Sequence, residues 1–127
     1  MLNAKELLKA AVSAGPAINS QFPAPRVIEA TDDVINLDVP FTLQLPAINS
    51  DSKFDVLLVF INADSTFSPQ AIVHLPAVNG VPTEGQVDNN TLLPPFHRDQ
   101  NAVLQCFLRL RGTDIWQRTP DSVIYSF

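Results

Sequence analysis

Cysteine and glycine are both scarce: Cys106 is the only cysteine, and there are four glycines among 127 residues. A single cysteine excludes an intrachain disulfide, so folding does not require an oxidising compartment. No CxxC, HxxxH or HExxH spacing occurs, and neither GxGxxG nor GxxxxGK[ST] is present. These absences argue against a zinc site and a phosphate-binding loop, and we expect no metal and no cofactor.

Charged residues are also few, at 17% of the chain, and the net charge is −5. A nucleic-acid surface needs clustered Lys and Arg. The eight basic residues here are scattered, except for Arg109 and Arg111 on one predicted strand face. We therefore expect no nucleic-acid partner, and we interpret the acidic balance as favouring solubility.

Long apolar runs are missing as well. No stretch approaches eighteen uncharged apolar residues, so we expect no membrane span. The first fifteen residues lack a signal peptide's apolar core, because Lys5, Glu6 and Lys9 interrupt it. We expect the protein to be cytoplasmic at synthesis and, if it works outside a cell, to leave by lysis, by dedicated machinery or in a virion.

What the sequence does contain is 46% hydrophobic residues and eleven prolines. This length and composition suit one domain with a sizeable core. Prolines at this density separate short strands and leave room for one sizeable helix.

The first residues predict that helix. Asn3 is a good N-cap with Glu6 in capping-box spacing, and Gly15 followed by Pro16 marks the end. An apolar stripe follows from the helical period: Leu7, Leu8, Ala11 and Val12. The stripe could pack on its own domain or on a neighbouring chain, because the following segment resembles a tether. We divide the chain into a helix and tether, 1–22, and a β-domain, 23–127.

From residue 26 onwards the pattern has period two. Short apolar runs bounded by Asp, Asn or Pro predict strands at 26–30, 33–37, 41–45, 54–63, 71–75, 86–88, 102–112 and 122–127. The run 54–63 is almost entirely apolar, which indicates a strand buried on both faces or ending in an interface. Together these strands predict an antiparallel β-sandwich of about seven strands with one short N-terminal helix.

The motif PAINS occurs at 16–20 and 46–50, and PAVNG occurs at 76–80, thirty residues apart. The blocks between them do not share an apolar pattern, as true repeats would. We interpret the motifs as three similar turns at one end of the sandwich.

The runs PAPRVIEATDDVINLDVP, FTLQL, FDVLLVF, AIVHLP, NAVLQCFLRLRG and TPDSVIYSF, in that order, resemble a bacterial immunoglobulin-like module. Such modules occur along large surface proteins or singly on phage particles. The resemblance covers 23–127. The chain lacks a second cysteine, and Trp116 comes late, in a turn-like region, which excludes an antibody-type domain. The resemblance implies a binding or spacer role and carries over no functional residues.

Few residues carry candidate chemistry. We expect His74 to lie at a sheet surface beside Ile72, and Cys106 to be buried and inert. His97 lies near Asp99, as a base and its orienter would, but no nucleophile is marked nearby. Two oxygen-rich stretches, 32–33 and 88–91, are interpreted as solvated turns, because they lack a calcium loop's spacing. We therefore expect no enzymatic activity.

Two sets of residues are candidates for an interface with other proteins. One is the helix stripe, with Leu7, Leu8 and Val12. The other is the face of 102–112 opposite the core, with Phe107, Arg109 and Arg111, because aromatic and Arg side chains are preferred at interfaces. The alternative for the second set is a solvated strand face.

The leading interpretation is therefore a structural or assembly protein that binds copies of itself or other subunits, such as a decoration, tail or fibre-attachment component of a phage-like particle. The alternative is an immunoglobulin-like module of a bacterial surface or secreted system that binds protein or carbohydrate. Its candidate platform is Trp116 with Asp114 and Gln117, since sugar sites use exposed aromatic rings beside carboxylates and amides.

Overall fold

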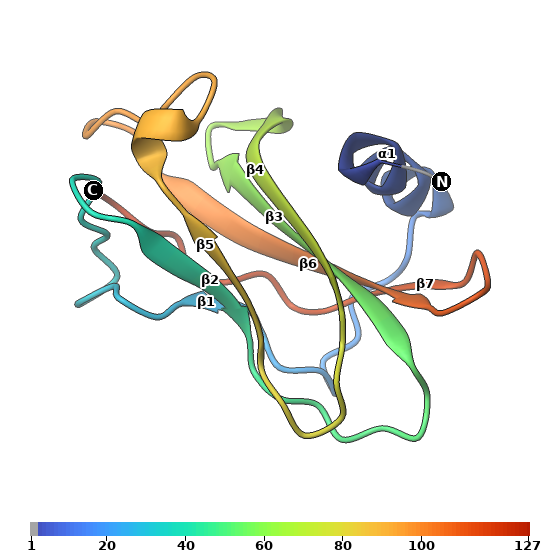
Figure 1. The fold of residues 1–127 in the computed structure, drawn as a ribbon. Coiled ribbons are helices and arrows are strands. Elements are labelled where there is room, and N and C mark those ends of the chain that lie inside the picture. Colours follow the sequence, from blue (N-terminus) through green and yellow to red (C-terminus); the bar gives the residue numbers. More distant parts are fainter. Residues whose placement is uncertain (1–2) are drawn as a thin grey trace.

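Two antiparallel sheets face each other in the computed structural model, which describes residues 3–127 apart from the side chains of 65–68 (Figure 1). The three-stranded sheet has the order β1-β2-β5 and the four-stranded sheet the order β4-β3-β6-β7. The described residues form one α-helix, seven strands and a 3₁₀ turn: α1 (Ala4–Ala14), β1 (Arg26–Val27), β2 (Phe41–Leu45), β3 (Phe54–Asn62), β4 (Ser65–Pro76), β5 (Thr83–Val87), η1 (Asn89–Thr91), β6 (Ala102–Leu110) and β7 (Trp116–Arg118). The prediction of a mainly β chain with two packed sheets and a short N-terminal helix is confirmed.

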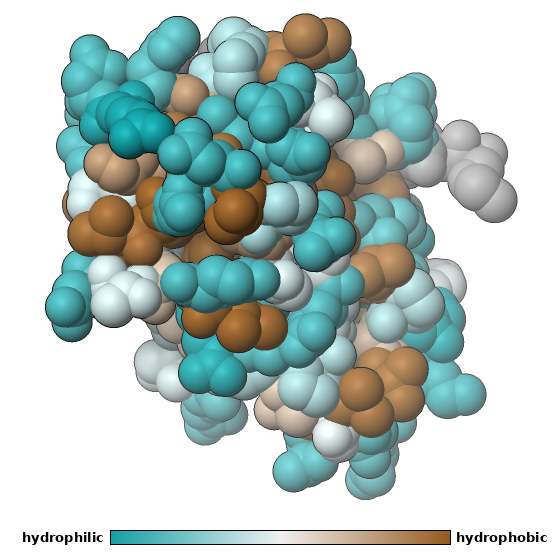
Figure 2. All heavy atoms as spheres, turned by 60° about the vertical axis from the view of Figure 1, so that its left-hand side comes forward, coloured by the Kyte–Doolittle hydropathy of each residue, from teal (hydrophilic) through white to brown (hydrophobic). Residues whose placement is uncertain are grey.

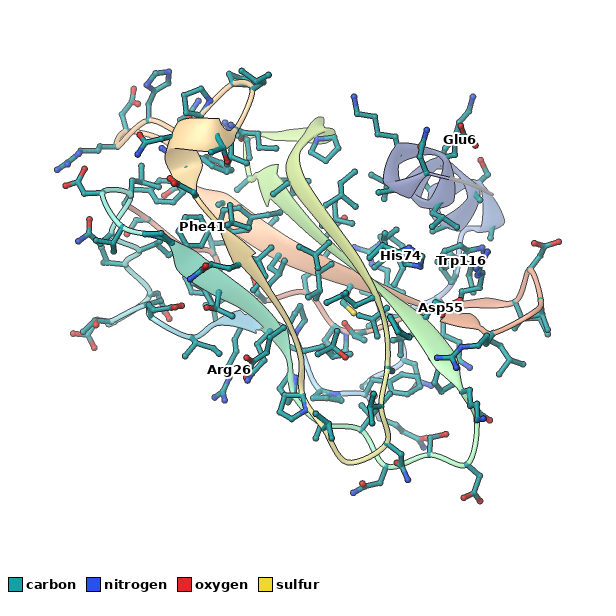
Figure 3. All side chains as sticks on the ribbon, in the orientation of Figure 1. Glu6, Arg26, Phe41, Asp55, His74 and Trp116 are labelled. Atoms are coloured by element: carbon teal, nitrogen blue, oxygen red, sulfur yellow. The ribbon has the colours of Figure 1, made fainter. Side chains whose placement is uncertain are left out.

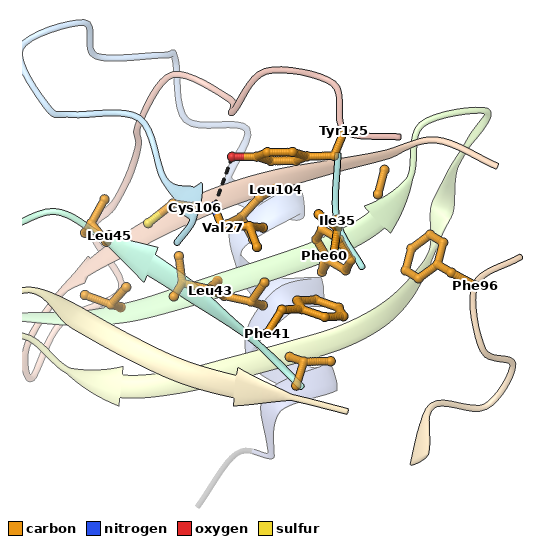
Figure 4. Packing of buried hydrophobic residues seen from close by; sticks show 14 of the residues in the cluster. Val27, Ile35, Phe41, Leu43, Leu45, Phe60, Phe96, Leu104, Cys106 and Tyr125 are labelled. Carbon is orange, nitrogen blue, oxygen red and sulfur yellow. Dashed lines mark hydrogen bonds between the residues drawn. The ribbon is translucent and has the colours of Figure 1, made fainter. Parts of the chain in front are cut away.

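The core between the sheets follows the strand period of two. Alternate side chains of β2, β3 and β6 point into it and are almost fully buried (Figure 4): Phe41, Leu43, Leu45, Val56, Leu58, Phe60, Leu104, Cys106 and Leu108. The predicted inward position of Cys106 is therefore confirmed. At one edge of this core the Tyr125 hydroxyl accepts a hydrogen bond from the Val27 N–H at 2.9 Å, which ties the C-terminal segment to β1.

Strand β3 is buried on both faces, as the apolar run predicted. Three apolar side chains on its other face form a second cluster beneath α1 with Leu7 and Ala11 of the helix and Phe107 of β6: Leu57, Val59 and Ile61. The helix begins and ends as predicted, because the Asn3 side chain accepts from the Glu6 N–H at 2.9 Å and Gly15 closes it with φ +57°. Leu7 and Ala11 of the apolar stripe therefore pack on the chain's own sheet, whereas Val12 remains exposed.

Three strand predictions need correction. The segments 33–37 and 122–127 are not strands; they run beside each other through an isolated bridge between Val34 and Ser126. Conversely, Trp116 lies in strand β7, which pairs with the edge of β6, and not in a turn. A three-residue strand is too short to leave a period-two signal, so its pairing with β6 defines it.

Two of the three related turns lie side by side at one end of the sandwich. The Gly80 N–H donates to the Ile48 carbonyl at 3.0 Å, and the Ser50 N–H donates to Asn79 Oδ1 at 2.9 Å. The third turn, 16–20, instead lies beside β7, where the Asn19 N–H donates to the Arg118 carbonyl at 2.7 Å.

The edges of β4 and β5 approach closely where Gly85 meets Val73. A Cβ added at Gly85 would lie 2.5 Å from Val73 Cγ1 and 3.2 Å from its Cβ, and the branched Val73 has little freedom to move. We expect Gly85→Ala to lower the free energy of unfolding by about 1–3 kcal/mol, as overpacking does. Urea denaturation of both single variants and the Gly85→Ala/Val73→Ala double variant measures this. Val73→Ala should recover much of the loss, whereas purely additive effects would show that the two residues do not collide.

Candidate functional site

A groove runs along α1 on the outer face of the four-stranded sheet. Its volume is about 860 Å³. The helix forms one wall, β3, β4 and β6 form the floor, and the loop after η1 closes the far side with Leu93 and Pro94. The groove therefore lies between elements from four separate parts of the sequence.

Apolar side chains at the rim offer most of the accessible surface. Val59 and Ile61 on the floor are each only 1% exposed, so they shape the groove more than they contact an occupant. By contrast, Val12 on the helix is 61% exposed and Leu93 on the loop is 94% exposed. Exposed apolar side chains that gather around a groove, and do not stand singly, are typical of a contact site for another molecule.

The loop that carries Leu93 is held in place from both sides. The Asn89 amide donates to the Phe96 carbonyl at 3.1 Å, and its Oδ1 accepts from the Phe96 N–H at 2.8 Å. Phe96 in turn packs against Phe60 in the core, and Gln70 of β4 donates to the Pro94 carbonyl at 2.8 Å. The interpretation of 88–91 as a fully solvated turn is wrong for Asn89, which is buried because it fastens this loop.

The charged residues that line the groove are all basic: Lys5, Lys9 and Arg118. Arg118 is neutralised by Asp121 at 3.0 Å and lies over the Phe107 ring at 5.5 Å. Lys5 and Lys9 are exposed and, within the described part of the chain, form no salt bridge. No described carboxylate lines the groove, although the whole chain carries −5.

The predicted interface residues divide between this groove and the chain's own packing. Leu8 and Val12 line the groove, but Leu7 is 2% exposed and packs on the sheet. The placement of Phe107 on a solvent-facing side of its strand is wrong, because α1 covers that side and leaves Phe107 only 3% exposed. Neither Leu7 nor Phe107 presents a surface to a partner in this structure.

Arg109 and Arg111 do point to the outer face, where Asp55 of β3 binds both. Arg109 Nη2 lies 3.0 Å and Arg111 Nε 3.4 Å from the Asp55 carboxylate. Figure 3 shows Asp55, His74 and Trp116 together beside α1 on this side of the sheet. One carboxylate therefore offsets one of the two positive charges, and the three side chains together keep a net charge of +1.

The structure does not bring the three candidate sugar-binding residues onto one surface. Trp116 is half-buried, and the Arg109 guanidinium lies 5.8 Å from its ring centroid. Gln117 pairs with the core residue Leu108 and so faces the opposite side of β7, while Asp114 lies exposed in the preceding turn. A stacking platform with its polar partners is therefore not assembled here.

The histidines lie at the surface. His74 is exposed on the same face of β4 as Ile72, which confirms its predicted position. His97 and Asp99 are exposed in a loop, and between residues 3 and 127 no hydrogen bond joins their side chains. The described residues also contain no group of three or more His, Cys, Asp or Glu side chains placed to hold a metal ion.

Burial raises the pKa of the Cys106 thiol to about 12, against a smaller lowering by a hydrogen bond with Thr119. The unfolded thiol ionises near pH 9, whereas the folded one keeps its proton, so the unfolded state is favoured as pH rises from 9 towards 12. We expect the stability difference between the native protein and Cys106→Ala to shrink by about 1.4 kcal/mol per pH unit above 9. Urea denaturation of both proteins at pH 8 to 10.5 tests this, and parallel pH profiles would contradict it.

Searches of family models, of curated proteins and of solved structures found no match to this chain. Among the described residues, no helix has the length and apolar character needed to cross a membrane.

Proposed function

We propose that this chain is a non-enzymatic structural module that takes part in an assembly by binding a partner protein in the groove beside α1. The observation that carries the proposal is the pairing of an open groove with Leu93, an apolar side chain 94% exposed on a fastened loop. A loop backbone that is already held in place loses little conformational entropy on association.

The strand order supports the narrower form of the proposal, an immunoglobulin-like module. In immunoglobulin-like sandwiches the second and fifth strands pair in one sheet, and the third pairs with the strands near the C-terminus in the other. Here β2 pairs with β5, and β3 pairs with β6, which pairs with β7. On this fold analogy we propose a role as a decoration, tail or fibre-attachment part of a phage-like particle.

Exposed apolar side chains also occur outside the groove, among them Val78, Val81 and Ile124. Figure 2 shows, on the side of the molecule that carries the C-terminus, apolar groups separated by hydrophilic side chains. Outside the groove, the Cys106 thiol is buried and the Asp55 carboxylate is paired with two arginines, so neither group is open to a substrate. This distribution supports a binding role over a catalytic one.

Selection of a random peptide library on the folded protein tests the proposal and does not require the partner to be identified first. We expect enriched peptides to lose binding to the variant Val12→Ser/Leu93→Ser and to keep it on Val123→Ser/Ile124→Ser. The second pair is exposed to a similar degree as Val12 and lies outside the groove. Failure to enrich any peptide over the groove variant would contradict the proposal.

A further inference from the structure

We propose that the occupant of the groove is an acidic segment of a partner protein, with apolar side chains towards the floor and carboxylates beside Lys5 and Lys9. This inference rests on the proposed binding role and adds the chemistry of the partner. It follows from the length of the groove, its charge and the position of its apolar rim.

The groove is long enough to accommodate a stretch of polypeptide. Its lining follows α1 from Lys5 to Ser13, and a rise of 1.5 Å per residue makes this about 12 Å. That length accommodates about four residues of extended chain or about two turns of helix. A compact ligand such as one sugar ring would contact only part of it.

The charge of the groove selects an anionic partner. Lys5 and Lys9 are four residues apart on the same side of α1, an arrangement that costs a little helix stability. The nearby Glu6 does not line the groove, and among the described residues it forms no salt bridge with either lysine. With Arg118 already paired, two ammonium groups remain to attract carboxylates at the rim.

The apolar rim determines where the segment's hydrophobic side chains would lie. Leu8 and Ile72 are half-buried and flank the floor, while Val12 and Leu93 stand at the two sides of the opening. Gln105 on the floor is half-buried, and its amide could pair with a backbone group of the segment. An occupant with leucine-like residues between glutamates or aspartates matches this arrangement.

Designed peptides of about fourteen residues test the inference. The first has leucines on one helical face flanked by glutamates, and two matched peptides replace every glutamate by glutamine or by lysine. Fluorescence anisotropy at low salt gives the affinities, and amide chemical shifts of the protein give the location. The protein variants are Lys5→Glu/Lys9→Glu and a control with the same change of net charge, Lys53→Glu/Arg98→Glu, whose positions lie outside the groove.

We expect the glutamate peptide to bind about ten-fold more tightly than the glutamine peptide, and the preference to weaken as salt is raised. Lys5→Glu/Lys9→Glu should remove that preference, the control should keep it, and amide shifts should concentrate around Val12, Leu93 and Gln105. Circular dichroism checks that both variants remain folded.

Equal binding of the glutamate and glutamine peptides, or an unchanged preference in Lys5→Glu/Lys9→Glu, would overturn the inference. So would changes in the amide chemical shifts of groove residues that dodecanoate causes and none of the peptides causes. A protein dimer in light scattering that the variant Val12→Ser/Leu93→Ser dissociates would also overturn it. The library selection separates this failure from that of the binding role. If the selected peptides are neutral or basic and still require Leu93 for binding, the binding role stands and only the acidic occupant is rejected.

Discussion

Replacing Ala11 by glutamate is expected to detach α1 from the sheet and to lower the free energy of unfolding by about 3 kcal/mol. Ala11 lies on the side of α1 that faces the sheet, and it is fully buried in the cluster that contains Leu57 and Val59. A carboxylate there would be buried among apolar side chains, so the helix must lift to return it to water. Urea denaturation measures the loss, and tryptic cleavage after Lys5 and Lys9 reports the detached helix.

Ser13→Glu is the matched control, because Ser13 belongs to the same helix and is exposed. A surface substitution of this kind should change stability by no more than about 0.5 kcal/mol. If Ala11→Glu were as stable and as resistant to trypsin as the control, the helix would not depend on this contact. The groove would then lack a fixed wall, and the proposed site would lose its basis.

The helix illustrates what local sequence signals determine. Its N-cap, stop signal and apolar stripe are all local features, and the structure places its ends where they predict. Whether the stripe packs on its own sheet or on a neighbour is not local. Two apolar surfaces predicted separately, the stripe with Leu7 and the second face of β3, turn out to cover each other.

The error at Phe107 has the same origin. Alternation correctly assigns Cys106 and Phe107 to opposite faces of β6. It does not tell whether the face opposite the core meets water or another element, because that depends on where α1 crosses the sheet. Phe107 lies where α1 covers β6 and is therefore buried in apolar packing. Arg109 and Arg111 lie beyond the helix and pair with Asp55.

The groove itself could not be predicted from periodicity. Its residues come from the helix, four strands and the loop at Leu93, and only the tertiary arrangement makes them neighbours. One signal was available: two leucines followed by two prolines at 92–95, inside the longest polar stretch. An apolar residue in a loop stiffened by prolines either packs on the core or is exposed where another molecule can contact it. Here Leu93 is the exposed residue.

Asn89→Ala is expected to lower the free energy of unfolding by about 2–4 kcal/mol, because it leaves the buried Phe96 N–H and carbonyl without partners. Asn90→Ala, at an exposed neighbouring position, should change stability little. Urea denaturation of the two variants gives the difference. Equal stabilities of the two variants would show that the hydrogen bonds between the Asn89 side chain and the Phe96 backbone do not hold the loop.

The same variant tests whether a fixed Leu93 matters for binding. Asn89 does not line the groove, so any loss of peptide affinity in Asn89→Ala must come through the mobility of the loop. We expect affinity for library-selected peptides to fall several-fold at a temperature where the variant is still folded, and amide exchange to accelerate across 90–95. Faster exchange with unchanged affinity would mean that Leu93 adapts to its partner on binding, and the argument from a rigidly presented anchor would then be wrong.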